Sequence, residues 1–409
     1  MNEQGSLKVA VVGGGAAGMF LAANLGAMAP GVRTVVLERA ERLLRKVRVS
    51  GGGRCNCTNT FEDVGDLAAV YPRGHRLMKR LFNEFDQEDA WRWFEQRGVR
   101  LTAQEDGCVF PVAQDSRVII ECLVREARRC GAEVWCGVGE VLPMPAPNGG
   151  GWKIAGESFD CVVVAVGGQP RAAGLQWYVD LGGKVEAPVP SLFTFTIDDA
   201  SLRSLMGTVV EGARVFIPGT KLKAEGALLI THWGVSGPAV LHLSSYAARH
   251  LAECAYRAPL GVNWLGKNEQ EASEMLRQMA VASPRRRLTA VHSPTIPSRL
   301  WEHLLGRSGI ARPDERMWCE LSLRECNRLA TLLTADVYEI CGRSTFKEEF
   351  VTCGGVALSD IHPATLESRV CPGLYFVGEV LDVDGVTGGY NLQAAWTTAY
   401  TVAKAIARL

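Results

Sequence analysis

The chain has 409 residues, of which 47% are hydrophobic, and its 44 basic and 44 acidic side chains cancel. This length predicts two or three domains, or one large interrupted domain, with enough apolar residues for a sizeable core. The zero net charge gives no support to a nucleic-acid partner or an acidic membrane surface, so we expect neither.

Thirteen cysteines are scattered along the chain without a C-x-x-C pair, and Cys55 and Cys57 are too close together for a usual zinc site. The N-terminus has no signal-peptide pattern, and the longest apolar run, Cys161–Val166, is far too short to cross a bilayer. We therefore expect no metal, no membrane association, reduced thiols and a cytoplasmic protein.

The chain opens with a strand, a glycine turn and a helix. The apolar run Leu7–Val12 has no polar face, as in a strand buried on both sides of a parallel sheet. It is followed by the spacing G-x-G-x-x-G at Gly13, Gly15 and Gly18. These glycines allow a tight turn, the approach of a pyrophosphate and close packing of the helix. Residues 16–29 are good helix formers, and their first N–H groups would face the phosphate.

A second strand completes this unit. Val35–Leu37 is apolar and ends at Glu38, about 20 residues beyond Gly18, where a carboxylate accepts the ribose hydroxyls of an adenosine. We therefore predict a bound adenine dinucleotide. The alternative is a glycine-rich turn that binds nothing, and this motif alone does not separate FAD from NAD.

The next notable segment is the glycine-rich loop of residues 50–59, SGGGRCNCTN. Its many backbone donors, beside Arg54, Asn56 and Asn59, could wrap a phosphate or the edge of a flavin. The alternative is an ordinary flexible turn.

Helices and short strands alternate after this loop. Apolar spacing predicts helices at Leu77–Gln96 and Arg117–Cys130, short strands within Gly98–Phe110, and strands at Glu133–Cys136 and Phe159–Val166. The last of these strands is fully apolar and ends in Gly167 and Gly168, where the backbone could pass close to a cofactor. The alternative is a buried strand with a glycine turn.

From about Ser191 short alternating runs predict the antiparallel strands of a second domain. These runs are Leu192–Ile197, Thr208–Ile217, Ala227–Thr231 and Ala255–Asn263, and helices are expected at Ala239–Leu251, Glu269–Ala280, Ser298–Leu305 and Glu325–Leu333. Ser236 is the expected cap of the first helix. His232 precedes that helix and could face a substrate, although such a histidine is more often structural.

The buried-strand pattern returns near the C-terminus, at Val351–Val356 and again at 373–377, where the strand ends in Gly378 and Glu379. A glycine-rich tail and a long helix to Leu409 follow. The carboxylate can hold ribityl hydroxyls, and a glycine-led helix can stabilise the negative charge of reduced flavin. NAD needs no such second binding segment, so the C-terminal end of the chain favours FAD. The expected limits are 1–190 and 346–409 for the FAD-binding domain and 191–345 for an inserted cap domain.

Four blocks, SGGGRCNCTN, THWGVSGPAVL, VTCGGVALSDIHPATLES and GLYFVGEVLDVDGVTGGYNLQAAW, resemble the YhiN/BaiN-type flavoprotein family, also described as aminoacetone-oxidase-like. The resemblance implies an α/β fold in which a glutathione-reductase-like Rossmann domain for non-covalent FAD is interrupted by a cap domain with a small β-barrel and helices. The cofactor-binding residues that follow by position are Gly13, Gly14, Gly15, Ala16, Ala17, Gly18, Glu38, Arg39, Lys46, Ser50, Gly51, Gly52, Arg54, Cys55, Asn59, Ala165, Gly167, Gly168, Gly378, Glu379, Gly389, Tyr390, Asn391 and Leu392.

The sequence departs from the family pattern in one place. The family reads Ala-Thr-Gly-Gly and then a longer loop, whereas Ala165-Val166-Gly167-Gly168 is followed here by a shorter route to Gly182. This loop would form a wall of the substrate pocket, so the substrates of relatives transfer poorly.

We expect an FAD-dependent oxidoreductase that reduces a small enone-like molecule with electrons from NAD(P)H. No second G-x-G-x-x-G marks a nicotinamide site, so this cosubstrate is left open. The alternatives are an amine oxidase that uses O₂, an RNA-modifying flavoprotein and a flavin-binding protein without turnover. His232, Asp384 and Tyr390 are the candidate proton donors. The oligomeric state is left open.

Overall fold

The structure is a computed structural model that describes residues 7–147, 150–344 and 351–409. The described residues divide into two compact units. Unit 1 comprises residues 7–190 and 351–409, and unit 2 comprises residues 191–344. The boundary expected between residues 345 and 346 lies outside the described residues, and the domain limits remain our proposal.

Unit 1 is built on a five-stranded parallel sheet with the strand order β19-β10-β1-β2-β6. Its strands are β1 (Lys8–Val12), β2 (Arg33–Glu38), β6 (Glu133–Cys136), β10 (Cys161–Val164) and β19 (Leu374–Phe376). Val12 lies beside Leu37 on one side and Val164 on the other. The carboxyl ends of the central strands therefore share one edge of the sheet, and β19 adds the C-terminal segment to it.

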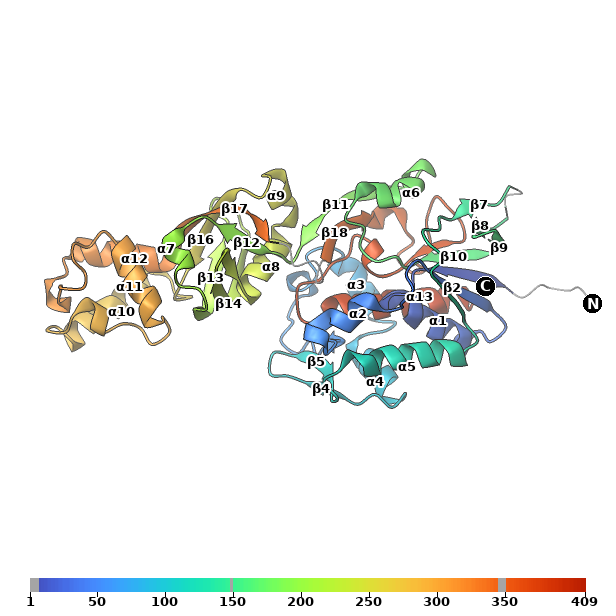
Figure 1. Cartoon of the computed structure of the whole chain (residues 1–409), viewed down its shortest axis with the longest axis horizontal. Coiled ribbons are helices and arrows are strands. Elements are labelled where there is room, and N and C mark those ends of the chain that lie inside the picture. Colours follow the sequence, from blue (N-terminus) through green and yellow to red (C-terminus); the bar gives the residue numbers. More distant parts are fainter. Residues whose placement is uncertain (1–6, 148–149, 345–350) are drawn as a thin grey trace, which may run out of the picture. The chain divides into compact units, whose positions relative to one another are not determined.

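Three long helices pack together in unit 1 (Figure 1). They are α1 (Ala16–Met28), α5 (Ser116–Arg129) and α13 (Tyr390–Ile406). Ten consecutive residues of α1, from Ala17 to Gly26, are buried. A helix that is apolar on every side needs cover on every side. The C-terminal helix α13 supplies part of this cover, and α5 supplies another part.

Smaller elements surround this core. They are α2 (Arg45–Val49), β3 (Thr58–Asn59), α3 (His75–Leu81), α4 (Gln87–Glu95), β4 (Leu101–Ala103), β5 (Cys108–Pro111), β7 (Met144–Pro145), β8 (Trp152–Ile154), β9 (Glu157–Phe159), α6 (Gln176–Asp180), β11 (Val185–Ser191) and β18 (Val351–Val356). Strands β3, β5 and β4 form one small sheet, β7 to β9 another, and β11 pairs with β18.

The single helix expected over Leu77–Gln96 is wrong, because the segment forms two helices, α3 and α4. Asp86 begins α4: its side chain accepts hydrogen bonds from the N–H groups of Glu88 and Asp89 at 2.9 and 3.0 Å. The Asp89 side chain in turn accepts from the Asp86 N–H at 3.1 Å. This capping box starts a new helix, while the apolar spacing continues across the break and conceals it.

The helix expected over Ala239–Leu251 is likewise two helices, α8 (Pro238–Tyr246) and α9 (Ala248–Glu253). Its cap is Gly237 and not Ser236, which ends β15 (Gly234–Ser236). Gly237 has φ +96°, and a Cβ there would lie 2.6 Å from the Ala227 carbonyl oxygen. Close packing against the strand that contains Ala227 thus selects glycine at this cap.

Unit 2 contains a closed antiparallel barrel with the order β12-β15-β14-β13-β16-β17, which confirms the predicted small barrel. The remaining barrel strands are β12 (Thr194–Ile197), β13 (Val209–Phe216), β14 (Lys223–Thr231), β16 (Ala258–Asn263) and β17 (Asp336–Ser344). The other helices of unit 2 are α7 (Ala200–Arg203), α10 (Glu269–Ala282), α11 (Ser298–Arg307) and α12 (Leu323–Ala335). One hydrophobic core includes both barrel and helix residues, such as Phe195, Trp264 and Trp301.

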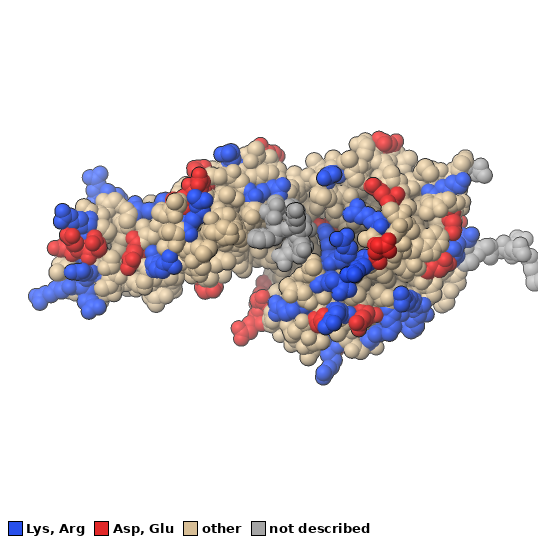
Figure 2. All heavy atoms as spheres, in the orientation of Figure 1, with Lys and Arg blue, Asp and Glu red and all other residues tan. Residues whose placement is uncertain are grey.

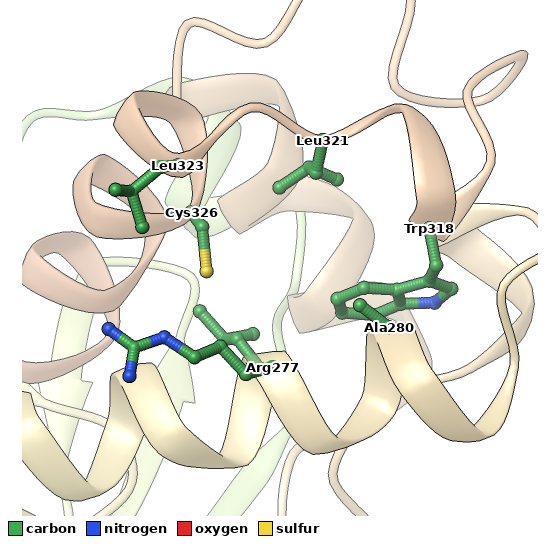
Figure 3. A pocket seen from close by; sticks show the side chains of 7 residues that line it. Arg277, Ala280, Trp318, Leu321, Leu323 and Cys326 are labelled. Carbon is green, nitrogen blue, oxygen red and sulfur yellow. The ribbon is translucent and has the colours of Figure 1, made fainter.

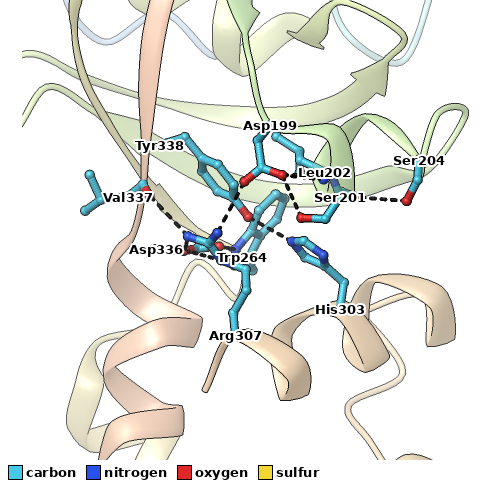
Figure 4. A network of polar contacts seen from close by, with 10 residues as sticks. All are labelled: Asp199, Ser201, Leu202, Ser204, Trp264, His303, Arg307, Asp336, Val337 and Tyr338. Carbon is cyan, nitrogen blue, oxygen red and sulfur yellow. Dashed lines mark hydrogen bonds and ion pairs between the residues drawn. The ribbon is translucent and has the colours of Figure 1, made fainter. Parts of the chain in front are cut away.

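A polar network joins the barrel to the helices of unit 2 (Figure 4). Asp336 is 1% exposed and accepts hydrogen bonds from Arg307 at 2.8 Å and from the Trp264 indole at 3.1 Å. The Arg307 guanidinium also contacts Asp199 at 3.4 Å and lies 4.5 Å from the centre of the Tyr338 ring. A buried carboxylate is tolerated only with such partners, so the network fixes α11 against β17.

We predict that Asp336→Ala lowers the free energy of unfolding of unit 2 by about 3 kcal/mol, because it leaves the Arg307 charge and the Trp264 N–H without their buried acceptor. Urea unfolding followed by hydrogen exchange in β16 and β17 measures this loss. The matched control is Asp198→Ala, whose carboxylate is exposed and pairs with Arg203, and it should cost under about 0.5 kcal/mol. Equal effects of the two substitutions would contradict the role of the network.

Candidate cofactor and active site

The glycine turn lies at the carboxyl edge of the sheet of unit 1. Gly13 has φ +112°, and a Cβ there would lie 2.4 Å from the Ala165 carbonyl oxygen. At Gly18 a Cβ would lie 2.0 Å from the Gly13 carbonyl oxygen, so close packing of β1, β10 and α1 requires both glycines. Gly15 differs, because no atom lies within 4 Å of its Cβ position. Gly15 is the cap of α1 and, as a glycine, has no side chain to cap this end of the helix, which suits a phosphate.

The Glu38 side chain turns back toward this glycine turn. Its carboxylate accepts hydrogen bonds from the N–H groups of Gly14 at 2.7 Å and Ala40 at 2.8 Å. The Leu44 N–H donates to the Gly14 carbonyl at 2.9 Å, which holds the loop after β2 on the same edge. A ribose attached to a pyrophosphate at Gly15 would therefore lie within reach of the Glu38 carboxylate.

Glu379 joins three segments that are distant in sequence. Its carboxylate lies 2.7 Å from the Lys46 ammonium and accepts the Thr352 N–H at 3.0 Å. A Cβ on Gly168 would lie 2.5 Å from the same carboxylate, so the turn after β10 passes directly against it. The Glu379 side chain is 19% exposed and that of Lys46 is 61% exposed. This carboxylate is thus fixed by the protein yet open on one side.

The glycine-rich loop is bound to the start of α13. The Asn59 side chain donates to the Gly388 carbonyl at 3.0 Å, and the Thr58 hydroxyl donates to the Gln393 side chain at 2.6 Å. A Cβ on Gly389 would lie 2.2 Å from the Thr58 carbonyl oxygen. The first and last segments of the chain therefore meet, as the sequence predicts for one joint site.

The remaining predicted cofactor residues of the loop have different surroundings. The Arg54 guanidinium lies 4.2 Å from the centre of the Phe110 ring and donates to the Gly51 carbonyl at 3.2 Å. Cys55 is fully buried, and burial raises the pKa of its thiol to about 12. A protonated, buried thiol is unreactive, so Cys55 contributes packing. All thirteen cysteines are free thiols.

The three candidate proton donors differ in position. Asp384 is 0% exposed and its carboxylate is bound by the Arg73 guanidinium, so it is held as a partner of that side chain. Tyr390 is buried and is the first residue of α13. His232 belongs to unit 2, where it is exposed in the turn after β14, with its ring 4.4 Å from that of Trp233. The catalytic roles of these residues stay predictions.

Sequence reasoning missed Tyr71, Arg73 and Thr352. The Tyr71 hydroxyl donates to the Tyr390 carbonyl at 2.8 Å, and Arg73 binds Asp384. A basic and an acidic residue separated by more than 300 positions leave no periodic signal. The run Tyr71-Pro72-Arg73-Gly74 has the composition of a turn and gives no sign of its partner.

A separate hollow of about 270 Å³ lies in unit 2 between α10 and α12 (Figure 3). Its lining residues are Leu276, Arg277, Ala280, Trp318, Leu321, Leu323 and Cys326. None of the predicted site residues lines it. Among the described residues, no helix is long and apolar enough to cross a membrane, and no group of side chains is arranged to hold a metal ion.

The parallel sheet carries a glycine turn at its carboxyl edge, and the C-terminal segment adds the strand β19 to the same sheet. This fold and the family match below define the class: the chain is an FAD-dependent oxidoreductase with a Rossmann-type FAD-binding domain. The chain belongs to the family described as the HI0933-like protein Rossmann domain, whose model matches residues 7–405. This match confirms the family resemblance that the sequence blocks indicated.

Curated relatives match along almost the whole chain. A 3-dehydro-bile acid delta(4,6)-reductase of Clostridium scindens is 28% identical and covers 98% of this chain and 99% of its own length. A ribosomal RNA dihydrouridine synthase of Escherichia coli is 30% identical and covers 96% of each chain. A ribosomal RNA dihydrouridine synthase of Haemophilus influenzae is 28% identical over 97% of this chain and 98% of its own.

We predict that Gly15→Ala weakens FAD binding at least tenfold, because its Cβ occupies the open space through which a pyrophosphate approaches the backbone. The fold should be retained, since that Cβ meets no protein atom. Flavin fluorescence on titration of the apoprotein measures the affinity, and thermal unfolding of the apoprotein checks the fold. The matched control is Gly65→Ala, which is exposed, also without a neighbour within 4 Å, and should bind FAD normally. Unchanged FAD affinity in Gly15→Ala would contradict the assigned phosphate position.

Proposed function

We propose that this protein uses FAD to reduce a carbon–carbon double bond conjugated to a carbonyl group, with NAD(P)H as the electron donor. The observation that carries the proposal is the meeting of the glycine-rich loop with the start of α13, through the Asn59–Gly388 and Thr58–Gln393 hydrogen bonds. These bonds join a helix N-terminus to the glycine-rich loop, which supports a flavin held between the two. Such a terminus stabilises the negative charge of a reduced flavin.

The names of the relatives describe one kind of chemistry. The names of a 3-dehydro-bile acid delta(4,6)-reductase and a dihydrouridine synthase both describe the reduction of a carbon–carbon double bond in a ring. In the 3-oxo bile acid and in the uracil ring, that double bond is conjugated to a carbonyl group. An enone and a uracil ring accept hydride at the carbon remote from the carbonyl, and the adjacent carbon then takes up a proton. This shared reaction supports reduction over amine oxidation for the present chain.

The residues of unit 1 divide the work of holding FAD. The turn at Gly15 would bind the pyrophosphate, Glu38 the adenosine ribose, and Glu379 the ribityl chain. Residues 389–392 would lie along the isoalloxazine. When bound, FAD supplies hydride transfer. Tyr390 and His232 remain the proposed proton donors, whereas the Arg73 ion pair makes Asp384 a structural partner.

A uracil ring within RNA is the second candidate substrate. Exposed basic side chains gather on and just before α2, as Figure 2 shows for this face of unit 1, and they are Arg39, Arg42, Arg45, Lys46 and Arg48. The chain is neutral as a whole, but this local surface can contact phosphates. Two relatives carry the name of a ribosomal RNA dihydrouridine synthase. Cytoplasmic location stays a prediction.

We predict that NADPH or NADH bleaches the visible bands of the FAD-loaded protein under anaerobic conditions, and that a cyclic enone restores them. Stopped-flow absorbance of the flavin measures both half-reactions. Loss of colour with a primary amine but with neither nucleotide would contradict the reductase proposal and support an amine oxidase. Reduction by nucleotide without reoxidation by any enone or by uracil-containing RNA would contradict the proposed substrate class.

If RNA is the substrate, Arg42→Gln combined with Arg45→Gln should weaken binding of a uracil-rich RNA. The slope of log K against the logarithm of the salt concentration should become shallower by about 2, one for each lost phosphate contact. Gel shifts at several salt concentrations measure this. Arg128→Gln is the control, because Arg128 is exposed near the C-terminal end of α5, just before β6 begins at the opposite edge of the sheet. Salt-independent RNA binding, or equal loss in the control, would contradict this candidate and leave the small enone.

A further inference from the structure

A buried ion pair connects the segment after the glycine-rich loop to the loop before α13. The Asp384 side chain is 0% exposed and that of Arg73 is 11% exposed. The Arg73 Nε and Nη2 groups donate to the two carboxylate oxygens of Asp384, and the two backbones also form an antiparallel β-bridge. Burying two charges costs desolvation free energy that their attraction barely repays. Such a pair is better explained by the geometry that it imposes than by the stability that it adds.

Further contacts around this ion pair join the same two segments, which we call the clamp (residues 70–74) and the tail loop (residues 383–389). The Val386 N–H donates to the Val70 carbonyl at 2.9 Å, and the Tyr71 hydroxyl donates at 2.8 Å to the carbonyl of Tyr390, the first residue of α13 beyond the tail loop. Gly74 has φ +78°, and a Cβ there would lie 2.6 Å from the Val383 side chain. The clamp therefore contacts the tail loop along most of its length.

The tail loop leads directly into α13. Gly389 ends the loop at φ +90° and is the cap of α13, and as a glycine it has no side chain to cap this end of the helix. Asn391, in the first turn, exchanges hydrogen bonds with the Gly385 N–H and carbonyl at 2.8 and 2.9 Å. These hydrogen bonds fix the tail loop to the first turn of α13, and the clamp contacts that loop.

We propose that Arg73 and Asp384 are positioning residues that set the N-terminus of α13 against the flavin, and so raise the reduction potential of bound FAD. The inference rests on the proposed placement of the isoalloxazine beside residues 389–392. The first N–H groups of α13 stabilise the reduced, anionic flavin only while they point at it. Loosening the clamp turns them away and favours the oxidised form.

A direct electrostatic effect of the two charges makes a different prediction. Removing the Arg73 charge would leave a negative carboxylate near the flavin and lower its potential, whereas removing the Asp384 charge would leave a positive guanidinium and raise it. Positioning predicts a potential shift of the same sign for both substitutions, because either one breaks the same two-bonded Arg73–Asp384 ion pair. The sign of the shift therefore separates the two explanations.

The experiment compares Arg73→Gln, Asp384→Asn and the double variant, which removes both charges. The potential of each FAD-loaded protein is measured by equilibration with a redox dye, and its affinity for oxidised FAD by flavin fluorescence. We expect all three variants to bind reduced FAD about tenfold less tightly relative to oxidised FAD than the wild type does, which for a two-electron couple lowers the potential by about 30 mV. Arg76→Gln, an exposed residue on α3, is the charge-matched control and should shift nothing.

Shifts of opposite sign in the two single variants, or wild-type potentials in all three, would overturn the proposal. Tyr71→Phe provides a milder variant should a charge change prevent folding: it keeps the buried ring, loses only the bond to the Tyr390 carbonyl, and should lower the potential by a smaller amount. A wild-type protein that binds no FAD would instead refute the proposed cofactor site, whereas normal FAD binding with unshifted variants refutes the clamp alone.

Discussion

Unit 1 is organised around the need to bury helix α1 on every side. This helix follows the glycine turn and is buried over ten consecutive residues, so it cannot exist at a surface. The chain covers it with α5 and with α13, the last helix of the sequence. Because β19 also pairs with β10 in the same sheet, the C-terminal segment has no independent core. The two ends of unit 1 therefore fold as one body, although the residues of unit 2 lie between them in sequence.

Because the two ends of unit 1 fold together, residues from both ends meet in the candidate site. Parallel strands present their carboxyl ends at one edge, and ligands of such sheets bind there. The edge holds the open Gly15 position and the Glu38 carboxylate from the N-terminal segment. It also holds Glu379 from the C-terminal segment, fixed by Lys46 and the Thr352 N–H. A site made from both ends can bind the two halves of a dinucleotide at once, which suits FAD.

The sequence predicts the local parts of this architecture well. The glycine spacing, the apolar strands and the barrel strands β12, β13, β14 and β16 each have a periodicity or a turn residue that identifies them, whereas β15 and β17 were not predicted. Two helix breaks are not predicted, at Asp86 and at Ala247, because apolar spacing continues through both. At Asp86 the side-chain capping box decides the break. The Arg73–Asp384 pair and the Tyr71 contact could not be predicted, since nothing local links residues more than 300 positions apart. The meeting of Asn59 with Gly388 was accessible only as a general expectation that the two ends form one site.

The most direct test of this account is whether the purified protein holds FAD. We predict that after reconstitution and removal of free flavin the protein retains one FAD per chain, with the two visible bands of a protein-bound flavin and quenched fluorescence. Complete release of flavin into the filtrate, with an absorbance spectrum of protein alone, would contradict the central claim. The carboxyl edge of unit 1 would then be a dinucleotide-like fold without this cofactor.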